Sequence, residues 1–94
     1  MVTVCVLRVD LSVLKARSLK EKRHVVKSIL ERSRAKFNVT AAEVEDHELN
    51  QRAGLAFATN SNDGRHARGR MDTLLDVLRQ HPAARVIDFT IESI

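Results

Sequence analysis

The chain of 94 residues is poor in aromatic residues and in cysteine. It has no Trp, no Tyr, three Phe and one Cys. A single cysteine excludes an internal disulfide and any metal or iron–sulfur site that needs several thiolates. No window of about 18 apolar residues occurs, so the sequence predicts no transmembrane helix. We therefore expect one soluble, cytoplasmic domain over residues 1–94 with no membrane partner.

Side chains that could support catalysis are equally sparse. Cys5 alternates with apolar residues, so it is expected to be a small buried hydrophobe and not a nucleophile. Residues 45–48 (Glu-Asp-His-Glu) have metal-ligand side chains, but adjacent positions cannot all point at one ion, which favours a solvated loop. The sequence has no Gly-rich phosphate loop. We expect no enzyme activity, no metal, no cofactor and no small-molecule substrate.

The longest periodic segment follows Ser18. Ser18 and Glu21 predict a capping box, in which the hydroxyl accepts from the Glu21 amide and the carboxylate reaches the Ser18 amide. A helix is therefore predicted to begin at Leu19 and to end between Lys36 and Asn38. Its apolar stripe, with Val25 at the margin, is predicted to face a core and comprises Leu19, Val26, Ile29, Leu30 and Phe37.

Hydrophobic alternation predicts one strand before this helix and three strands after it, at residues 2–11, 39–45, 51–60 and 85–94. Residues 46–50 are polar and predict a hairpin loop. Turn residues 61–64 supply an N-cap for a second helix over 65–80, which His81-Pro82 ends. The buried stripe of this second helix is predicted to be Ala67, Met71, Leu74, Leu75 and Leu78. In the last strand, one face is predicted to carry Ile87, Phe89 and Ile91, opposite Val86, Asp88, Thr90 and Glu92.

The element order β-α-β-β-α-β predicts a ferredoxin-like α+β fold, with a four-stranded antiparallel sheet and two helices on one face. The other face of the sheet would then carry Val2, Val4 and Val6 near Ala56 and Ala58. A solvated sheet face is usually more polar than this. Scattered surface apolar groups are one explanation, and cover by a second copy is the other. Val2, Val4 and Val6 are therefore candidates for an oligomer interface.

Positive charge is concentrated around the first helix. Residues 15–36 contain nine basic and two acidic side chains, a net charge of +7, whereas the rest of the chain carries −3. Several of these basic residues lie at or just before a helix N-terminus, where free amides also attract phosphate. On a helical wheel, one flank of the apolar stripe carries Lys20, Arg23, Lys27 and Arg34. The candidates for RNA or phosphate binding are Arg17, Lys20, Lys22, Arg23, Lys27 and Arg34.

Two ambiguities accompany these candidates. A basic helix face can also serve only to keep a protein soluble. Lys22 lies close to the apolar stripe, so either its stem snorkels to water or its ammonium has a specific partner.

RNA-recognition motifs share the predicted topology but stack bases on sheet aromatics, which this chain lacks. Contact with the RNA backbone needs no aromatics.

Three blocks of the sequence resemble the YlxP-like family of small bacterial proteins. They are residues 17–23 (Arg-Ser-Leu-Lys-Glu-Lys-Arg), 37–44 (Phe-Asn-Val-Thr-Ala-Ala-Glu-Val) and 50–53 (Asn-Gln-Arg-Ala). The similarity covers nearly the whole chain in order. It implies a ferredoxin-like domain of unknown function, whose genes often lie beside those for translation initiation and ribosome-binding factors. That family usually has Trp where this chain has Asn50.

Two functions remain open on the sequence. The first is a non-enzymatic RNA- or ribosome-associated protein that acts through its basic first helix. The alternative is a homo-oligomeric protein-interaction module that uses the apolar outer face of the sheet, without nucleic acid.

Overall fold

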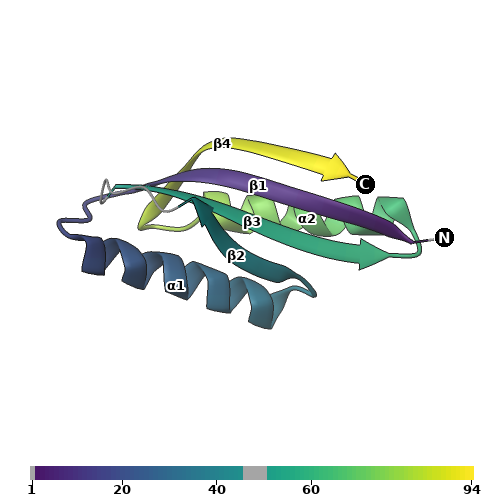
Figure 1. The fold of residues 1–94 in the computed structure, drawn as a ribbon, viewed down its shortest axis with the longest axis horizontal. Coiled ribbons are helices and arrows are strands. Elements are labelled where there is room, and N and C mark those ends of the chain that lie inside the picture. Colours follow the sequence, from purple (N-terminus) through teal and green to yellow (C-terminus); the bar gives the residue numbers. More distant parts are fainter. Residues whose placement is uncertain (1, 46–50) are drawn as a thin grey trace.

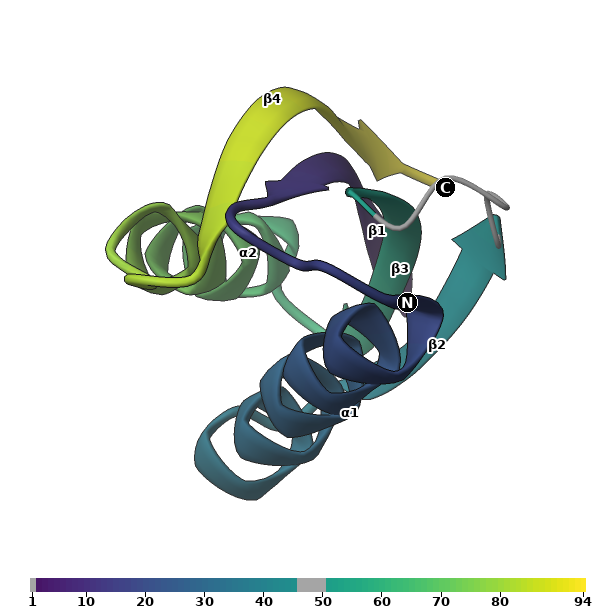
Figure 2. The same ribbon diagram turned by 90° about the vertical axis from the view of Figure 1, so that its left-hand side faces the viewer.

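The structure is a computed structural model that describes residues 2–45 and 51–94, so the predicted loop at 46–50 lies outside the described residues. The elements follow in the order β1 (Thr3–Val13), α1 (Leu19–Lys36), β2 (Thr40–Glu45), β3 (Arg52–Ser61), α2 (Gly64–Arg79) and β4 (Ala84–Ser93). The four strands form one antiparallel sheet in the order β2-β3-β1-β4. Both helices lie on the same side of this sheet (Figures 1 and 2), which confirms the predicted ferredoxin-like α+β fold. Within the described residues, neither helix is long and apolar enough to cross a membrane.

The hydrophobic core lies between the sheet and the two helices. On β1 every second residue points into it, so Cys5 is fully buried as predicted. On β3, Leu55 and Phe57, which pair with core residues of β1, are fully buried as well. The α2 stripe is also confirmed, and it comprises Ala67, Met71, Leu74, Leu75 and Leu78. Burying a large apolar side chain of this kind stabilises a fold by about 1.5–3 kcal/mol.

The N-terminus of α1 is capped largely as predicted. The Ser18 hydroxyl accepts from the Glu21 amide at 3.1 Å. The Glu21 carboxylate accepts from the amide of Arg17 at 2.6 Å, whereas the capping box predicted the amide of Ser18. Ser18 is extended, with φ −151° and ψ 163°. Because successive amides of an extended segment point to opposite sides, only one of these two neighbouring amides can face the carboxylate.

The buried face of α1 is rotated relative to the predicted stripe. Its buried residues are Lys22, Val26, Ile29 and Ser33. Leu19, predicted to be buried, is 36% exposed, so that part of the prediction is wrong. The Ser33 hydroxyl tolerates burial because it donates to the Ile29 carbonyl at 2.8 Å. The true buried face includes two polar residues, Lys22 and Ser33. Because the prediction counted only apolar residues, it placed the centre of the buried face too close to Leu19.

A bulge in β4 overturns the predicted alternation of that strand. Val86 lies opposite Leu11 and Asp88 lies opposite Asp10, so Ile87 is an extra residue without a partner in β1. An extra residue inverts the alternation that follows it. Val86 therefore packs against the core, together with Ile91, whereas the exposed fraction of Ile87 is 42%.

Candidate nucleic-acid interface

One flank of α1 presents four basic side chains, Lys20, Arg23, Lys27 and Arg34, all of them exposed, and we call this set the basic flank. At 3.6 residues per turn they fall within a sector of about 60° around the helix. The Arg34 guanidinium donates to the carbonyl oxygen of Ala41, so the flank lies on the β2 side of α1. Since β2 is an edge strand, Arg34 also covers one of its backbone acceptors.

Neighbouring acids neutralise little of this charge. Lys27 Nζ lies 4.0 Å from Glu31 Oε1 one helical turn away, and the two side chains are 76% and 61% exposed. Exposed pairs of this kind contribute about 0–1 kcal/mol and are screened by salt. The Ala41 carbonyl that Arg34 contacts is neutral, so it does not cancel the guanidinium charge. The basic flank therefore remains an electropositive surface, available to an external anion.

The other side of α1 carries Arg32, whose charge reaches the end of α2. Burial lowers the pKa of His81, which follows α2, and the charge of Arg32 on α1 lowers this pKa further. The His81 ring also accepts a hydrogen bond at Nδ1 from the Ala83 amide, at 3.0 Å. The two sides of α1 thus differ, since the basic flank contacts the β2 edge and the other side places a charge near the end of α2.

The predicted phosphate site at the start of α1 is not supported. Arg17 is exposed, but its amide and that of Glu21 already donate to acceptors within the cap. The Glu21 carboxylate also brings a negative charge to the first turn, which opposes a second anion. Any phosphate contact therefore rests on exposed basic side chains and not on the backbone amides of the helix terminus.

Lys22 must be removed from the candidate phosphate ligands, because its side chain is fully buried. Its stem therefore does not snorkel to water, and the residue makes an interaction of its own within the fold. An isolated charge in a protein interior would be very costly, so burial requires such compensation. Lys22 is thus one of the buried residues of α1. Of the two outcomes that its position beside the apolar stripe left open, the structure supports an interaction within the fold.

A hollow of about 430 Å³ opens beside the basic flank, where the chain leaves β1 and enters α1, and we call it the α1 hollow. Leu14, Ala16 and Val25 give it apolar walls. Lys15, which has an uncommon φ of 61°, and Lys20 of the basic flank line it as well. Sequence reasoning missed this hollow. The one feature of the sequence that could have indicated the hollow is Leu14, an apolar residue between the first predicted strand and the first predicted helix.

The outer face of the sheet carries Val4 and Val6 toward one end of β1, as predicted. Val4 and Val6 on β1 are half-buried and pair with Asn60 and Ala58 of β3. Val2 precedes β1 and is 66% exposed. The structure thus brings Val4 and Val6 together on this face, with Val2 just beyond it.

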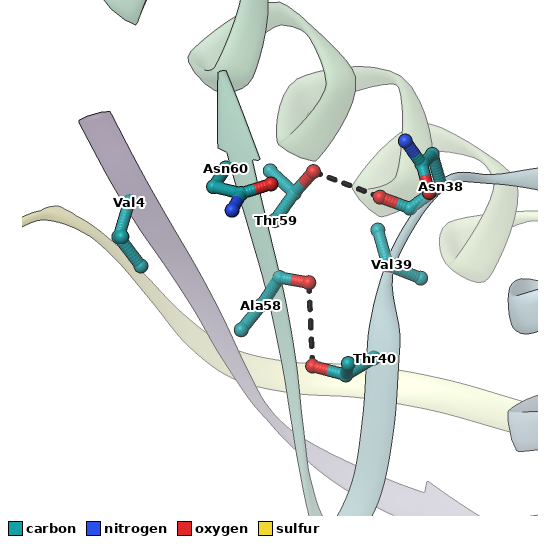
Figure 3. A pocket seen from close by; sticks show the side chains of 7 residues that line it. All are labelled: Val4, Asn38, Val39, Thr40, Ala58, Thr59 and Asn60. Carbon is teal, nitrogen blue, oxygen red and sulfur yellow. Dashed lines mark hydrogen bonds between the residues drawn. The ribbon is translucent and has the colours of Figure 1, made fainter. Parts of the chain in front are cut away.

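A second hollow, of about 280 Å³, lies at one end of this face (Figure 3). Figure 3 shows two hydrogen bonds at this hollow. The Thr59 hydroxyl donates to the Asn38 carbonyl at 2.8 Å, and the Thr40 hydroxyl donates to the Ala58 carbonyl at 3.4 Å. These hydroxyls are therefore occupied by the chain itself. None of the described residues that line this hollow is titratable, so it offers no general acid or base.

Of the predicted cluster at 45–48, only Glu45 belongs to the described residues. Its carboxylate forms an ion pair with Arg8 at 2.7 Å. Asp10 and Asp88 lie opposite each other on the same face. Within the described part of the chain, no group of three or more His, Cys, Asp or Glu side chains could hold a metal ion.

These features define a small ferredoxin-like α+β domain with a basic helix flank and an apolar sheet face. Residues 4–91 match the family described as "Protein of unknown function (DUF503)", and the chain belongs to that family. It is also similar in structure to the structured domain of Drosophila melanogaster Boca, with a TM-score of 0.52 and 21% identity over 93% of this chain and 95% of that one. At this identity the likeness supports the fold alone. No curated protein matches the chain.

Proposed function

We propose that this protein is a non-enzymatic, cytoplasmic RNA- or ribosome-associated protein that contacts phosphates through the basic flank of α1. The observation that carries the proposal is the alignment of four exposed basic side chains, Lys20, Arg23, Lys27 and Arg34. At 1.5 Å per residue they extend along about 21 Å of helix. That length is enough to contact the phosphates of several successive nucleotides.

The distribution of charge favours a polyanion as the partner. Residues 15–36 carry a net charge of +7 in a chain whose remainder is negative. Such a local excess steers anionic partners to one side of a protein. The near absence of aromatics favours contact with the backbone of RNA over base stacking on the sheet. The resemblance to YlxP-like proteins agrees with a partner in translation.

The proposal predicts a specific salt dependence. Each phosphate neutralised on single-stranded RNA contributes about −0.7 to the slope of log affinity against log salt, so four contacts predict a slope of about −3. Replacing Lys20 and Lys27 by Gln should weaken binding to all sequences equally and flatten the slope by about 1.4. Fluorescence anisotropy on ribosomal RNA fragments across a salt series measures both effects.

A matched control removes the same charge elsewhere. Arg65 on α2 and Arg85 on β4 are exposed and lie outside the basic flank. The double variant Arg65→Gln, Arg85→Gln should leave the slope near −3. Undetectable binding at low salt, or equal losses in the two double variants, would contradict the proposal. Co-sedimentation with ribosomal subunits at low and high salt then tests whether the ribosome is the partner.

A second candidate function is supported by the outer sheet face, and its occupant would be a second copy of the chain. Val4 and Val6 lie on a central strand and leave apolar surface on a face that has no helix. Static light scattering at tens of micromolar should then show a homodimer or a larger assembly. Val4→Glu should dissociate it, whereas Leu19→Glu on α1 should not. A monomeric wild-type protein would exclude this candidate.

A further inference from the structure

The α1 hollow shares Lys20 with the basic flank, so one end of the flank lies at the hollow. Leu14 forms one wall and has 44% of its surface exposed. Val25 forms another wall and is half-buried. The volume of about 430 Å³ lies in the range of small-ligand sites. The hollow is thus an apolar recess directly beside a polybasic surface.

The charges around the hollow suit one kind of occupant. Lys15, Lys20 and His24 bring nitrogen-bearing side chains to its lining. Glu21 is the one carboxylate among the lining residues, and its Oε2 atom accepts from the Arg17 amide. An anionic group is therefore favoured at the rim, and a neutral, flat group is favoured against the apolar walls. A nucleotide of single-stranded RNA combines these two properties, with a phosphate next to a base that has two apolar faces.

We infer that the α1 hollow holds one unpaired base of the bound RNA, between the Leu14 and Val25 side chains and beside the His24 imidazole. Lys15 and Lys20 then contact the adjacent phosphates. The inference rests on the proposed function of the same helix and adds a preference to it. Bases of a perfect duplex are stacked and paired, so they cannot enter the hollow. The protein therefore binds single-stranded RNA more tightly than duplex RNA of the same sequence.

The test compares a labelled single-stranded RNA of mixed sequence with the same strand in a perfect duplex, by fluorescence anisotropy. Leu14→Ala should weaken binding to the single strand about tenfold, because the bound base would bury less apolar surface against the shorter side chain. The same variant should leave the duplex affinity and the salt slope unchanged, because it removes no charge. Ile87→Ala, on β4, is the matched control, since its exposed fraction of 42% is close to that of Leu14. It should change neither affinity.

A second variant keeps the inference testable if Leu14→Ala does not fold. His24 is exposed on α1, so His24→Ala should fold and should also weaken single-strand binding selectively. Equal affinity for the two RNAs would overturn the base-binding inference, as would single-strand binding that neither variant weakens. The proposed function would survive that result if Lys27→Gln still flattened the salt slope. Undetectable RNA binding at low salt would overturn both.

Discussion

Alanine at Gly69 and alanine at Gly54 should change the stability of this protein in opposite directions. Gly69 lies inside α2 and is exposed, and no heavy atom of the described residues, apart from its chain neighbours and the nearby helix backbone, lies within 4 Å of the place a Cβ would take. Glycine in a helix interior is less favourable than alanine by about 0.8–1.0 kcal/mol. Gly69→Ala should therefore raise the free energy of unfolding by about 1 kcal/mol. For a domain of this size the melting temperature should rise by about 4–8 °C.

Gly54 lies on the outer face of β3, where two neighbouring strands bring side chains over its backbone. A Cβ at this position would lie 2.9 Å from Glu45 Cβ and 3.4 Å from Asp10 Oδ1. The first distance is shorter than real Cβ contacts, and Glu45 Cβ can move only with its backbone. That movement would also disturb the 2.7 Å ion pair between Glu45 and Arg8. Overpacking of this kind costs about 1–3 kcal/mol, so Gly54→Ala should lower the free energy of unfolding by that amount.

Urea denaturation followed by circular dichroism measures both variants, with an unchanged m-value showing that only stability has changed. The steric explanation also predicts an energetic coupling between positions 45 and 54. In a Glu45→Gly background the clash is absent, so Gly54→Ala should cost less there, and the double-mutant cycle should give a coupling energy of about 0.5 kcal/mol or more. A Gly54→Ala variant as stable as wild type would refute the argument from the close approach. A Gly69→Ala variant with no gain would refute the argument from helix propensity.

Three further predictions concern α1 and its surroundings. Ser18→Ala should lower the free energy of unfolding by about 0.5–2 kcal/mol in chemical denaturation, and its effect should not add to that of Glu21→Ala, because both residues cap the same helix. Lys22→Ala should lower the free energy of unfolding by about 2–5 kcal/mol in the same assay, as for other large buried side chains. Lys20→Ala should change the free energy of unfolding by no more than about 0.5 kcal/mol. Because burial and Arg32 lower the pKa of folded His81, the unfolded state binds more protons below about pH 6.5. Stability should then fall as the pH drops from about 6.5 through the lowered pKa, and denaturation midpoints of His81→Asn across this range should show a weaker decline.

The basic flank shows how much of a candidate site a local pattern can predict. Lys20, Arg23, Lys27 and Arg34 share one side of the helix because of the 3.6-residue repeat alone, and the structure leaves all four exposed. The α1 hollow could not be predicted in this way. Leu14 precedes the helix and Val25 lies within it, so their proximity depends on how the chain turns between β1 and α1.

The sequence by itself determined the features that arise from local chemistry and periodicity. The Ser18 cap, the start of α1 at Leu19 and the buried stripe of α2 all depend on residues within a few turns of one another. The order of the elements then restricted the fold to the ferredoxin-like topology, because connections of this kind are right-handed.

Only the tertiary structure decided how these elements face one another. It placed Lys22 in the interior, left Leu19 exposed and inserted the Ile87 bulge opposite β1. Each of these outcomes depends on packing between residues far apart in the chain, where the free energy of burial across the whole interface outweighs the preference of any single side chain. A lysine is therefore buried where the surrounding fold compensates its charge, and a leucine is exposed where the helix has turned its other side to the core.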